Sequence, residues 1–138
     1  MSEQLSLRIG NSLPELDRLH SEVECFLARC GVGGRTAYHI QLALDELVTN
    51  VICYAFDVQG GHSVEVLLER GPDTVDMTIR DAGKPFNPLL APAPDLDASP
   101  EARRVGGLGI HFVRTTMDRL SYERKDGMNI LHLSKKTT

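Results

Sequence analysis

The 138-residue sequence contains no tryptophan, only three cysteines and few aromatic residues, which make up 5% of the chain. Cys25, Cys30 and Cys53 are odd in number and lack the CxxC spacing of metal or redox sites, so we interpret them as reduced packing residues. No apolar run approaches the length of a membrane span. The first five residues lack the basic start and apolar block of a signal peptide. We therefore expect a cytoplasmic protein without a membrane partner.

Basic residues are outnumbered by acidic ones, 15 to 19, which gives a formal net charge of −4. No run of more than two basic residues occurs, so a nucleic-acid partner is not expected. The five histidines show no metal-ligand spacing, and the HExxH motif is absent. The GxxxxGK[ST] and GxSxG motifs are also absent, which argues against a P-loop protein and against an α/β-hydrolase.

The length fits one domain, 1–138, which can bury roughly two-thirds of the surface that its unfolded chain exposes. Alternating apolar residues predict strands near 5–9, 64–68, 75–79, 122 and 128–133. Helical spacing predicts helices from about 15 to 31, from 36 to before 59, and from 106 onward. The order β-α-α-β-β-loop-α-β-β predicts an α+β two-layer sandwich, with a mixed, mostly antiparallel sheet and helices on one face.

The predicted helix starts and the longest loop have local signatures. The segment from Ser12 to Glu15 has the spacing of a capping box, with Pro14 in the first turn, where its missing N–H costs little. Thr36 is expected to cap the second helix. The segment 87–105 contains four prolines and no clear period. Loops of about twenty residues in compact domains tend to be lids or binding loops.

The second predicted helix carries polar residues at the border of its apolar face. Because an α-helix turns about 100° per residue, one side collects the apolar residues Ala37, Ile40, Leu44, Leu47, Val48, Val51 and Ala55. Glu46 and Asn50 lie four residues apart and therefore stack along the margin of that face. They form a satisfied buried pair, or lie at the border and reach solvent, or form a site. In a site, Glu46 would be a general base and Asn50 an oxygen ligand for a hard cation such as Mg²⁺.

Asp81 ends a predicted strand and is followed by Gly83, whose missing side chain lets another group approach the backbone closely. A buried carboxylate at a strand end can accept a hydrogen bond from an exocyclic amine such as that of adenine. It would disfavour guanine, whose carbonyl oxygen would face the carboxylate. An ordinary strand-ending turn is the alternative interpretation.

Three glycines, Gly106, Gly107 and Gly109, lie at the start of the third predicted helix. Unpaired amides in a first helical turn can bind a phosphate, and the helix dipole favours the anion. Ordinary loop chemistry is the alternative interpretation. The segment does not fit a Rossmann fingerprint, because a third glycine is missing at Phe112 and the preceding residues are loop rather than strand.

Taken together, the order and spacing of these motifs resemble the ATP-binding domain of the GHKL superfamily, and most closely its anti-sigma-factor serine/threonine kinase branch. Residues 46–55 (ELVTNVICYA) look like the N box, 81–86 (DAGKPF) like the first glycine box and 106–110 (GGLGI) like the second. The resemblance covers roughly residues 36–133. It implies a Bergerat ATP-binding fold in which the loop 87–105 is the ATP lid.

The resemblance also implies a role for each motif. Glu46 would be the catalytic base, and Asn50 would hold Mg²⁺ against the triphosphate of ATP. Asp81 would bind the adenine amine, and the amides of 107–109 would hold phosphate oxygens. The implied nucleotide-binding residues are Asn50, Asp81, Gly83, Pro85, Phe86, Gly106, Gly107, Leu108, Gly109 and Ile110.

Three features depart from the family pattern. Pro85 stands where many superfamily members have a second glycine, which would narrow the base pocket. Tyr54 occupies a place often held by His in this branch. The lid is rich in proline, and its cations nearest to the phosphates would be Arg103 and Arg104.

The activity implied is that of an ATP- and Mg²⁺-dependent serine/threonine protein kinase that works as an anti-sigma factor in a partner-switching pathway. Its substrate would be a STAS-type anti-sigma-factor antagonist, a sigma factor would be a second partner, and the chain would form a homodimer. Two alternatives stay open. One is a non-catalytic ATP-bound adapter that sequesters a partner protein. The other is the detached catalytic half of a histidine kinase, which is disfavoured because the chain begins with a strand rather than a helix pair carrying a phosphoacceptor histidine.

Overall fold

The computed structural model describes residues 3–90 and 107–137. Within those ranges the strands are β1 (Glu3–Gly10), β2 (Ser63–Arg70), β3 (Thr74–Asp81), β4 (Arg119–Lys125) and β5 (Met128–Lys136). The helices are α1 (Glu15–Arg29), α2 (Gly34–Tyr54) and α3 (Gly107–Thr116), together with the short 3-10 helix η1 (Pro88–Leu90). Their order along the chain is the predicted one.

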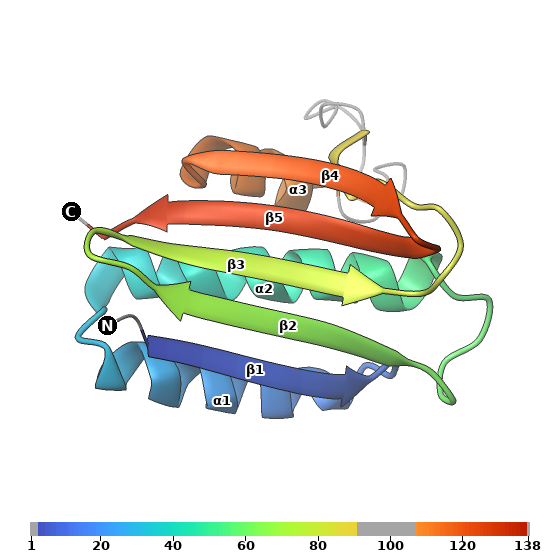
Figure 1. Ribbon diagram of the computed structural model, residues 1–138, viewed down its shortest axis with the longest axis horizontal. Coiled ribbons are helices and arrows are strands. Elements are labelled where there is room, and N and C mark those ends of the chain that lie inside the picture. The colour runs from blue at the N-terminus through green and yellow to red at the C-terminus, as the bar shows by residue number, and fades with distance from the viewer. Residues whose placement is uncertain (1–2, 91–106, 138) are drawn as a thin grey trace.

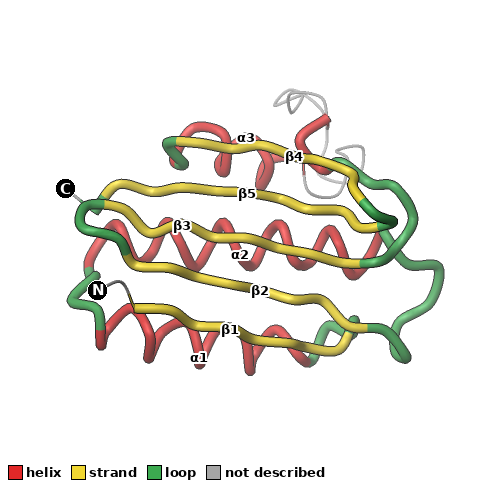
Figure 2. Tube along the Cα trace, in the orientation of Figure 1, coloured by secondary structure: helices red, strands yellow, loops and turns green. Residues whose placement is uncertain are grey.

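The strands form a single sheet in the order β1-β2-β3-β5-β4, and every neighbouring pair in it is antiparallel. Figures 1 and 2 show α1, α2 and α3 on the same side of this sheet, with α2 between the other two. The predicted α+β, two-layer arrangement is therefore confirmed. Since each described strand pair is antiparallel, the sheet is more uniform than the mixed one expected from the sequence.

The hydrophobic core lies between α2 and the sheet. On the sheet side it is built from alternate residues of three strands, Val64, Val66, Leu68, Val75, Met77, Ile79, Leu131 and Leu133. The facing side of α2 contributes Ile40, Leu44, Leu47, Val48 and Val51. Within the described ranges, no helix combines the length and the apolar character that crossing a membrane would require.

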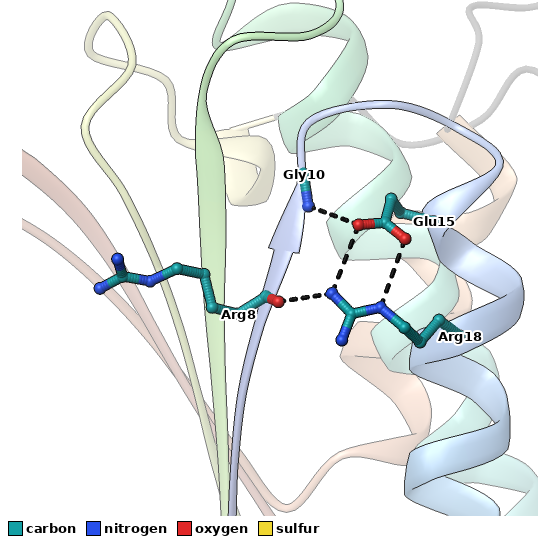
Figure 3. A network of polar contacts seen from close by, with 4 residues as sticks. All are labelled: Arg8, Gly10, Glu15 and Arg18. Carbon is teal, nitrogen blue, oxygen red and sulfur yellow. Dashed lines mark hydrogen bonds and ion pairs between the residues drawn. The ribbon is translucent and has the colours of Figure 1, made fainter.

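The start of α1 differs from the predicted capping box. Pro14 is the N-cap residue, and no side-chain cap hydrogen bond forms. Instead, Oε1 of Glu15 accepts a hydrogen bond of 2.9 Å from the backbone N–H of Gly10. Arg18 pairs with Glu15 and donates to the carbonyl oxygen of Arg8 at 2.6 Å (Figure 3). The hydrogen bonds from Arg18 and Gly10 lower the pKa of Glu15, and the network joins α1 to β1.

The cap predicted for the second helix is also wrong. The helix α2 begins at Gly34, its N-cap residue is Gly33, and no side-chain cap hydrogen bond forms there. Thr36 therefore lies inside the first turn. A glycine is an acceptable N-cap residue, because it costs only a few tenths of a kcal/mol relative to the preferred polar residues.

Two polar side chains interrupt the core-facing side of the sheet. The alternation that buries Ile79 also turns Asp81 inward, and Asn129 takes the inward position next to Leu131. Asp81 and Asn129 are directly paired across β3 and β5, and each is 2% exposed. Because buried polar groups need partners, this end of the sheet requires its own hydrogen bonds.

Asn129 supplies most of those hydrogen bonds. Its Nδ2 donates to Oδ1 of Asp81 and to the carbonyl oxygen of Lys84, both at 2.9 Å. Its Oδ1 accepts from the backbone N–H of Phe86 at 3.1 Å and from the hydroxyl of Tyr122 at 2.5 Å. One carboxamide thus joins β3, β4, β5 and the loop that follows β3.

We predict that Asn129→Ala destabilises the fold, because it leaves Asp81, the Phe86 N–H and the Tyr122 hydroxyl without this partner. Each buried polar group left unpaired costs about 1–3 kcal/mol, so we expect a loss of at least about 2 kcal/mol. Urea denaturation measures the free energy of unfolding. Ser121→Ala, at an exposed position of β4, is the control and should change it by less than about 0.5 kcal/mol. Equal stability of the two variants would contradict the prediction.

Candidate functional site

Asp81 lies at the end of β3 with its carboxylate turned toward the helix layer. Oδ1 accepts hydrogen bonds of 2.9 Å from the backbone N–H of Gly83 and from Nδ2 of Asn129. Among the residues that the structure describes, no donor reaches Oδ2. Burial raises the pKa of Asp81, while the hydrogen bonds from Asn129 and Gly83 and the charge of Arg124 act against that shift. Oδ1 is therefore held by two donors, whereas Oδ2 accepts no hydrogen bond from the described residues.

The loop after β3 is fixed against the C-terminal end of α2. The backbone N–H of Lys84 donates to the carbonyl oxygen of Ala55 at 2.9 Å, and Arg124 donates to the carbonyl oxygen of Gly83 at 2.7 Å. A methyl group added to Gly83 would lie 2.4 Å from the Ala55 carbonyl oxygen. The close approach predicted at this glycine is thus made by the protein's own main chain.

The other predicted members of this motif lie at its rim. Phe86 is half-buried, and its ring lies 5.7 Å from the ring of Tyr54, measured between centroids. This contact gives Tyr54, which departs from the family pattern, a packing role. Pro85 is exposed. The ammonium group of Lys84 pairs with Asp57 at 2.9 Å and closes the outer side of the loop.

Glu46 and Asn50 contact each other on α2. Nδ2 of Asn50 donates to the backbone carbonyl oxygen of Glu46 at 2.9 Å and to its Oε1 at 3.2 Å. Asn50 is 4% exposed, and within the described ranges its Oδ1 accepts no hydrogen bond. Burial raises the pKa of Glu46, the hydrogen bond from Asn50 lowers it, and the nearby charge of Asp45 raises it. The pair presents a carboxylate of raised pKa beside a carboxamide oxygen that has no donor among the described residues.

The third motif meets this pair through Gly109, in the first turn of α3. A methyl group added to Gly109 would lie 1.9 Å from Cδ of Glu46 and 2.2 and 2.3 Å from its two carboxylate oxygens. The carboxylate therefore rests against the main chain of α3, where the helix dipole favours a negative charge. The next residue, Ile110, is 2% exposed and anchors α3 in the core.

Some predicted positions lie outside the described residues. These are Gly106, the lid from 91 to 105, and with it Arg103 and Arg104. Gly107 begins α3, and the side chain of Leu108 is not among those described. The described site residues form two groups along α2. One group surrounds Asp81 near Ala55, and the other surrounds Glu46.

Two residues of this site, Asn129 and Arg124, were not predicted from the sequence. Arg124 carries no local signal, because an exposed arginine in a strand is common. Asn129 does carry one, since it occupies a core-facing position in a strand whose next inward residues are Leu131 and Leu133. A polar residue at such a position needs a partner, and here the partner is Asp81.

A depression of about 610 Å³ lies elsewhere, on the face of the sheet that the helices leave uncovered. Its lining includes Thr78, Ser121 and His132, which come from β3, β4 and β5. None of the predicted site residues lines it. The candidate site is therefore on the helix-covered side, where the motifs meet.

Known proteins similar to this chain belong to the family that the motifs resemble. A family model described as a histidine kinase-like ATPase domain matches residues 11–135. The chain is 31% identical over 100 residues to the serine/threonine-protein kinase BtrW of Bordetella bronchiseptica, covering 72% of this chain and 70% of BtrW. It is 25% identical over 111 residues to the serine-protein kinase RsbW of Listeria monocytogenes, covering 75% of this chain and 69% of that protein.

The fold is similar to that in a crystal structure of the RsbU and RsbW domains of a Mycobacterium tuberculosis protein. The TM-score is 0.64 at 17% sequence identity, and the match covers 96% of this chain. This chain spans about a third, 32%, of that solved chain. The resemblance stated from the motifs is confirmed. Because the family model spans a range that contains all three motifs, the chain belongs to the histidine kinase-like ATPase domain family.

Proposed function

We propose that this chain is an ATP- and Mg²⁺-dependent serine/threonine protein kinase. Membership of an ATPase domain family supports the use of ATP, and both curated relatives are named as protein kinases. The observation that carries the proposal is the contact between Glu46 and Gly109. This contact places a carboxylate of raised pKa next to the main chain of α3, which by the family resemblance would hold the terminal phosphates. A general base must act beside those phosphates.

The arrangement along α2 supports ATP lying lengthwise beside this helix. Ala55, which contacts the Asp81 loop, is nine residues from Glu46, or about 14 Å along the helix axis. Adenine and the terminal phosphate are at opposite ends of ATP. Oδ2 of Asp81, which accepts no hydrogen bond from the described residues, would accept one from the adenine amine, and the phosphates would lie near Gly109.

The residues present fit a magnesium ion shared with the nucleotide. Mg²⁺ usually keeps several waters and takes one or two protein oxygens together with phosphate oxygens. Oδ1 of Asn50 has no donor within the described residues and lies beside Glu46, so it suits this role. When bound, Mg²⁺ would neutralise phosphate charge. Asn50 would orient the ion, and its Nδ2 would continue to hold the Glu46 carboxylate.

In the reaction proposed, Glu46 accepts the proton of an acceptor serine or threonine hydroxyl. The hydroxyl oxygen forms a bond to the γ-phosphorus of ATP, the bond to the β-phosphate oxygen breaks, and ADP leaves. We further propose that the acceptor belongs to a STAS-type anti-sigma-factor antagonist. The chain would act in the cytoplasm as a homodimeric anti-sigma factor that also captures a sigma factor. The motifs and the likeness to BtrW and RsbW support this assignment.

Glu46→Gln tests the catalytic role. Glutamine keeps the size of the side chain and an oxygen for the hydrogen bond from Asn50, but it cannot take a proton. Phosphate transfer from radiolabelled ATP to the antagonist should fall by about 10²–10⁴-fold. Calorimetry should show ATP affinity changed by only a few fold. Glu22→Gln, at an exposed position of α1, is the control.

One result would contradict the role of Glu46, and another would contradict the kinase activity itself. Transfer by Glu46→Gln at the wild-type rate would remove Glu46 from the reaction. Binding of ATP by the wild type without any transfer to serine or threonine would favour the non-catalytic adapter.

The pH dependence of transfer gives a further prediction. The base must be deprotonated, and burial raises the pKa of Glu46. The rate should therefore begin to fall on acidification at a pH above the ordinary glutamate pKa of about 4.3. ATP affinity measured over the same range separates this effect from protonation of the nucleotide. The residual rate of Glu46→Gln should lack this decline, and a decline shared by both proteins would contradict the prediction.

Asp81→Asn tests recognition of adenine. The asparagine oxygen can accept the hydrogen bonds from Gly83 and Asn129, but no carboxylate is left for the adenine amine. Loss of a hydrogen bond to a charged acceptor should weaken ATP binding by about ten- to a hundredfold. Asp76→Asn, at an exposed position of the same strand, should bind ATP normally. Calorimetry with both variants measures the difference, and equal affinities would contradict the assignment.

Asp81→Asn should be no less stable to unfolding than the wild type at neutral pH. Because the pKa of Asp81 is raised in the folded state, its ionisation costs stability as the pH rises through the folded-state value. Below the ordinary aspartate range this cost is absent. The stability of Asp81→Asn relative to the wild type should therefore increase with pH, as denaturation at several pH values would show.

A further inference from the structure

We infer that Gly109 is a positioning residue for the Glu46 carboxylate, through a contact that any side chain at position 109 would destroy. The inference rests on the proposed function, in which Glu46 is the base. It assigns to Gly109 a role separate from any bond between its amide and a phosphate. The absence of a side chain, rather than the N–H group, is what the contact uses.

The structure leaves no room for a side chain at position 109. An added Cβ at Gly109 would be 1.9–2.3 Å from three atoms of the Glu46 carboxylate, whereas real Cβ atoms essentially never come closer than 3.0 Å to a neighbour. At Gly10 and Gly71 the nearest atom would be 3.5 and 3.4 Å away, which is ordinary contact. At Gly33 nothing would lie within 4 Å. A carboxylate oxygen is also near Gly10, at 3.5 Å, and near Gly83, at 2.9 Å, but only at Gly109 are all three nearest atoms carboxylate atoms, each within 2.3 Å of the added Cβ.

The carboxylate has two close neighbours. Nδ2 of Asn50 donates to Oε1 of Glu46 at 3.2 Å, and an added Cβ at Gly109 would overlap both carboxylate oxygens. The helix α3 is anchored by Ile110 and Val113, which are 2% and 0% exposed. An added methyl group would therefore displace the end of the Glu46 side chain more readily than it would displace the helix.

Displacing this carboxylate would affect catalysis more than folding. A general base must lie within hydrogen-bond reach of the proton that it takes. A misplacement of about 1 Å in a catalytic group can cost about 10²-fold in rate. Gly109→Ala should therefore lower kcat by about ten- to a hundredfold through Glu46, while the chain still folds.

The decisive measurement is whether the effect of Gly109→Ala depends on residue 46. Glu46→Asp shortens the side chain by one methylene and withdraws the carboxylate from position 109. In the Glu46→Asp background, Gly109→Ala should lower kcat by less than about threefold, even though Glu46→Asp alone is slower than the wild type. KM for ATP is measured in all four proteins, because a role limited to the phosphates would raise it equally in both backgrounds.

Thermal unfolding of the nucleotide-free protein tests the same contact without any activity. Gly109→Ala should lower Tm in the wild type, because the methyl group meets the carboxylate. In a Glu46→Ala background it should leave Tm unchanged or raise it, since alanine is the better helix former. Gly33→Ala, where nothing would be contacted, should shift Tm equally in both backgrounds.

The outcomes separate the inference from the proposed function. Dependence of both kcat and Tm on residue 46 supports the positioning role. Equal effects of Gly109→Ala in the two backgrounds overturn it, whether or not the protein is a kinase. If the wild type transfers no phosphate, the Tm comparison still decides whether the contact exists, and the proposed function fails on its own test.

Discussion

The hydrogen bond between Asn129 and Asp81 constrains the end of the sheet at which the candidate site is built. A carboxylate removed from water is costly unless donors replace the lost hydration. Here the replacement comes from the neighbouring strand and from the N–H of Gly83. The loop that provides this N–H is then fixed to α2 through Ala55. The geometry around Asp81 is thus set by the fold itself, so a ligand would spend little of its binding energy on ordering this loop.

Two glycines from different motifs lie at positions where a side chain would not fit. Gly83 has no room for a side chain because of Ala55, and Gly109 has none because of Glu46. One contact is made to the C-cap residue of α2, Ala55, and the other to Glu46 within the helix, at points about 14 Å apart along the helix axis. A single rigid helix therefore sets the distance between the two ends of the site. The glycines of such motifs are often explained by the phosphates that they bind. At these two positions, however, contacts within the protein already exclude a side chain, whether or not a nucleotide is bound.

The features of the fold and site that could be predicted are those that depend on local sequence patterns. Alternating apolar residues indicated the strands, helical spacing placed the polar pair of α2 side by side, and the order of three motifs indicated the family, which the comparison confirms. The partners of polar groups could not be predicted, because contacts between distant segments decide them. The register that pairs Asp81 with Asn129 is set between β3 and β5. Likewise, Glu15 fits a capping box but accepts from Gly10 instead, because β1 lies within reach.

The hydrogen bonds already made within the site constrain what it can bind. The donors of Asn129 and Asn50 are used inside the protein, whereas Oδ2 of Asp81, Oδ1 of Asn50 and Oε2 of Glu46 accept no hydrogen bond from the described residues. The Glu46 carboxylate lies against the first turn of α3. A surface rich in acceptors selects ligands that offer an amine, a cation or a proton. A bare triphosphate would be repelled by Glu46, so the proposed function requires a metal ion beside Asn50 and the positive end of α3 to offset that repulsion.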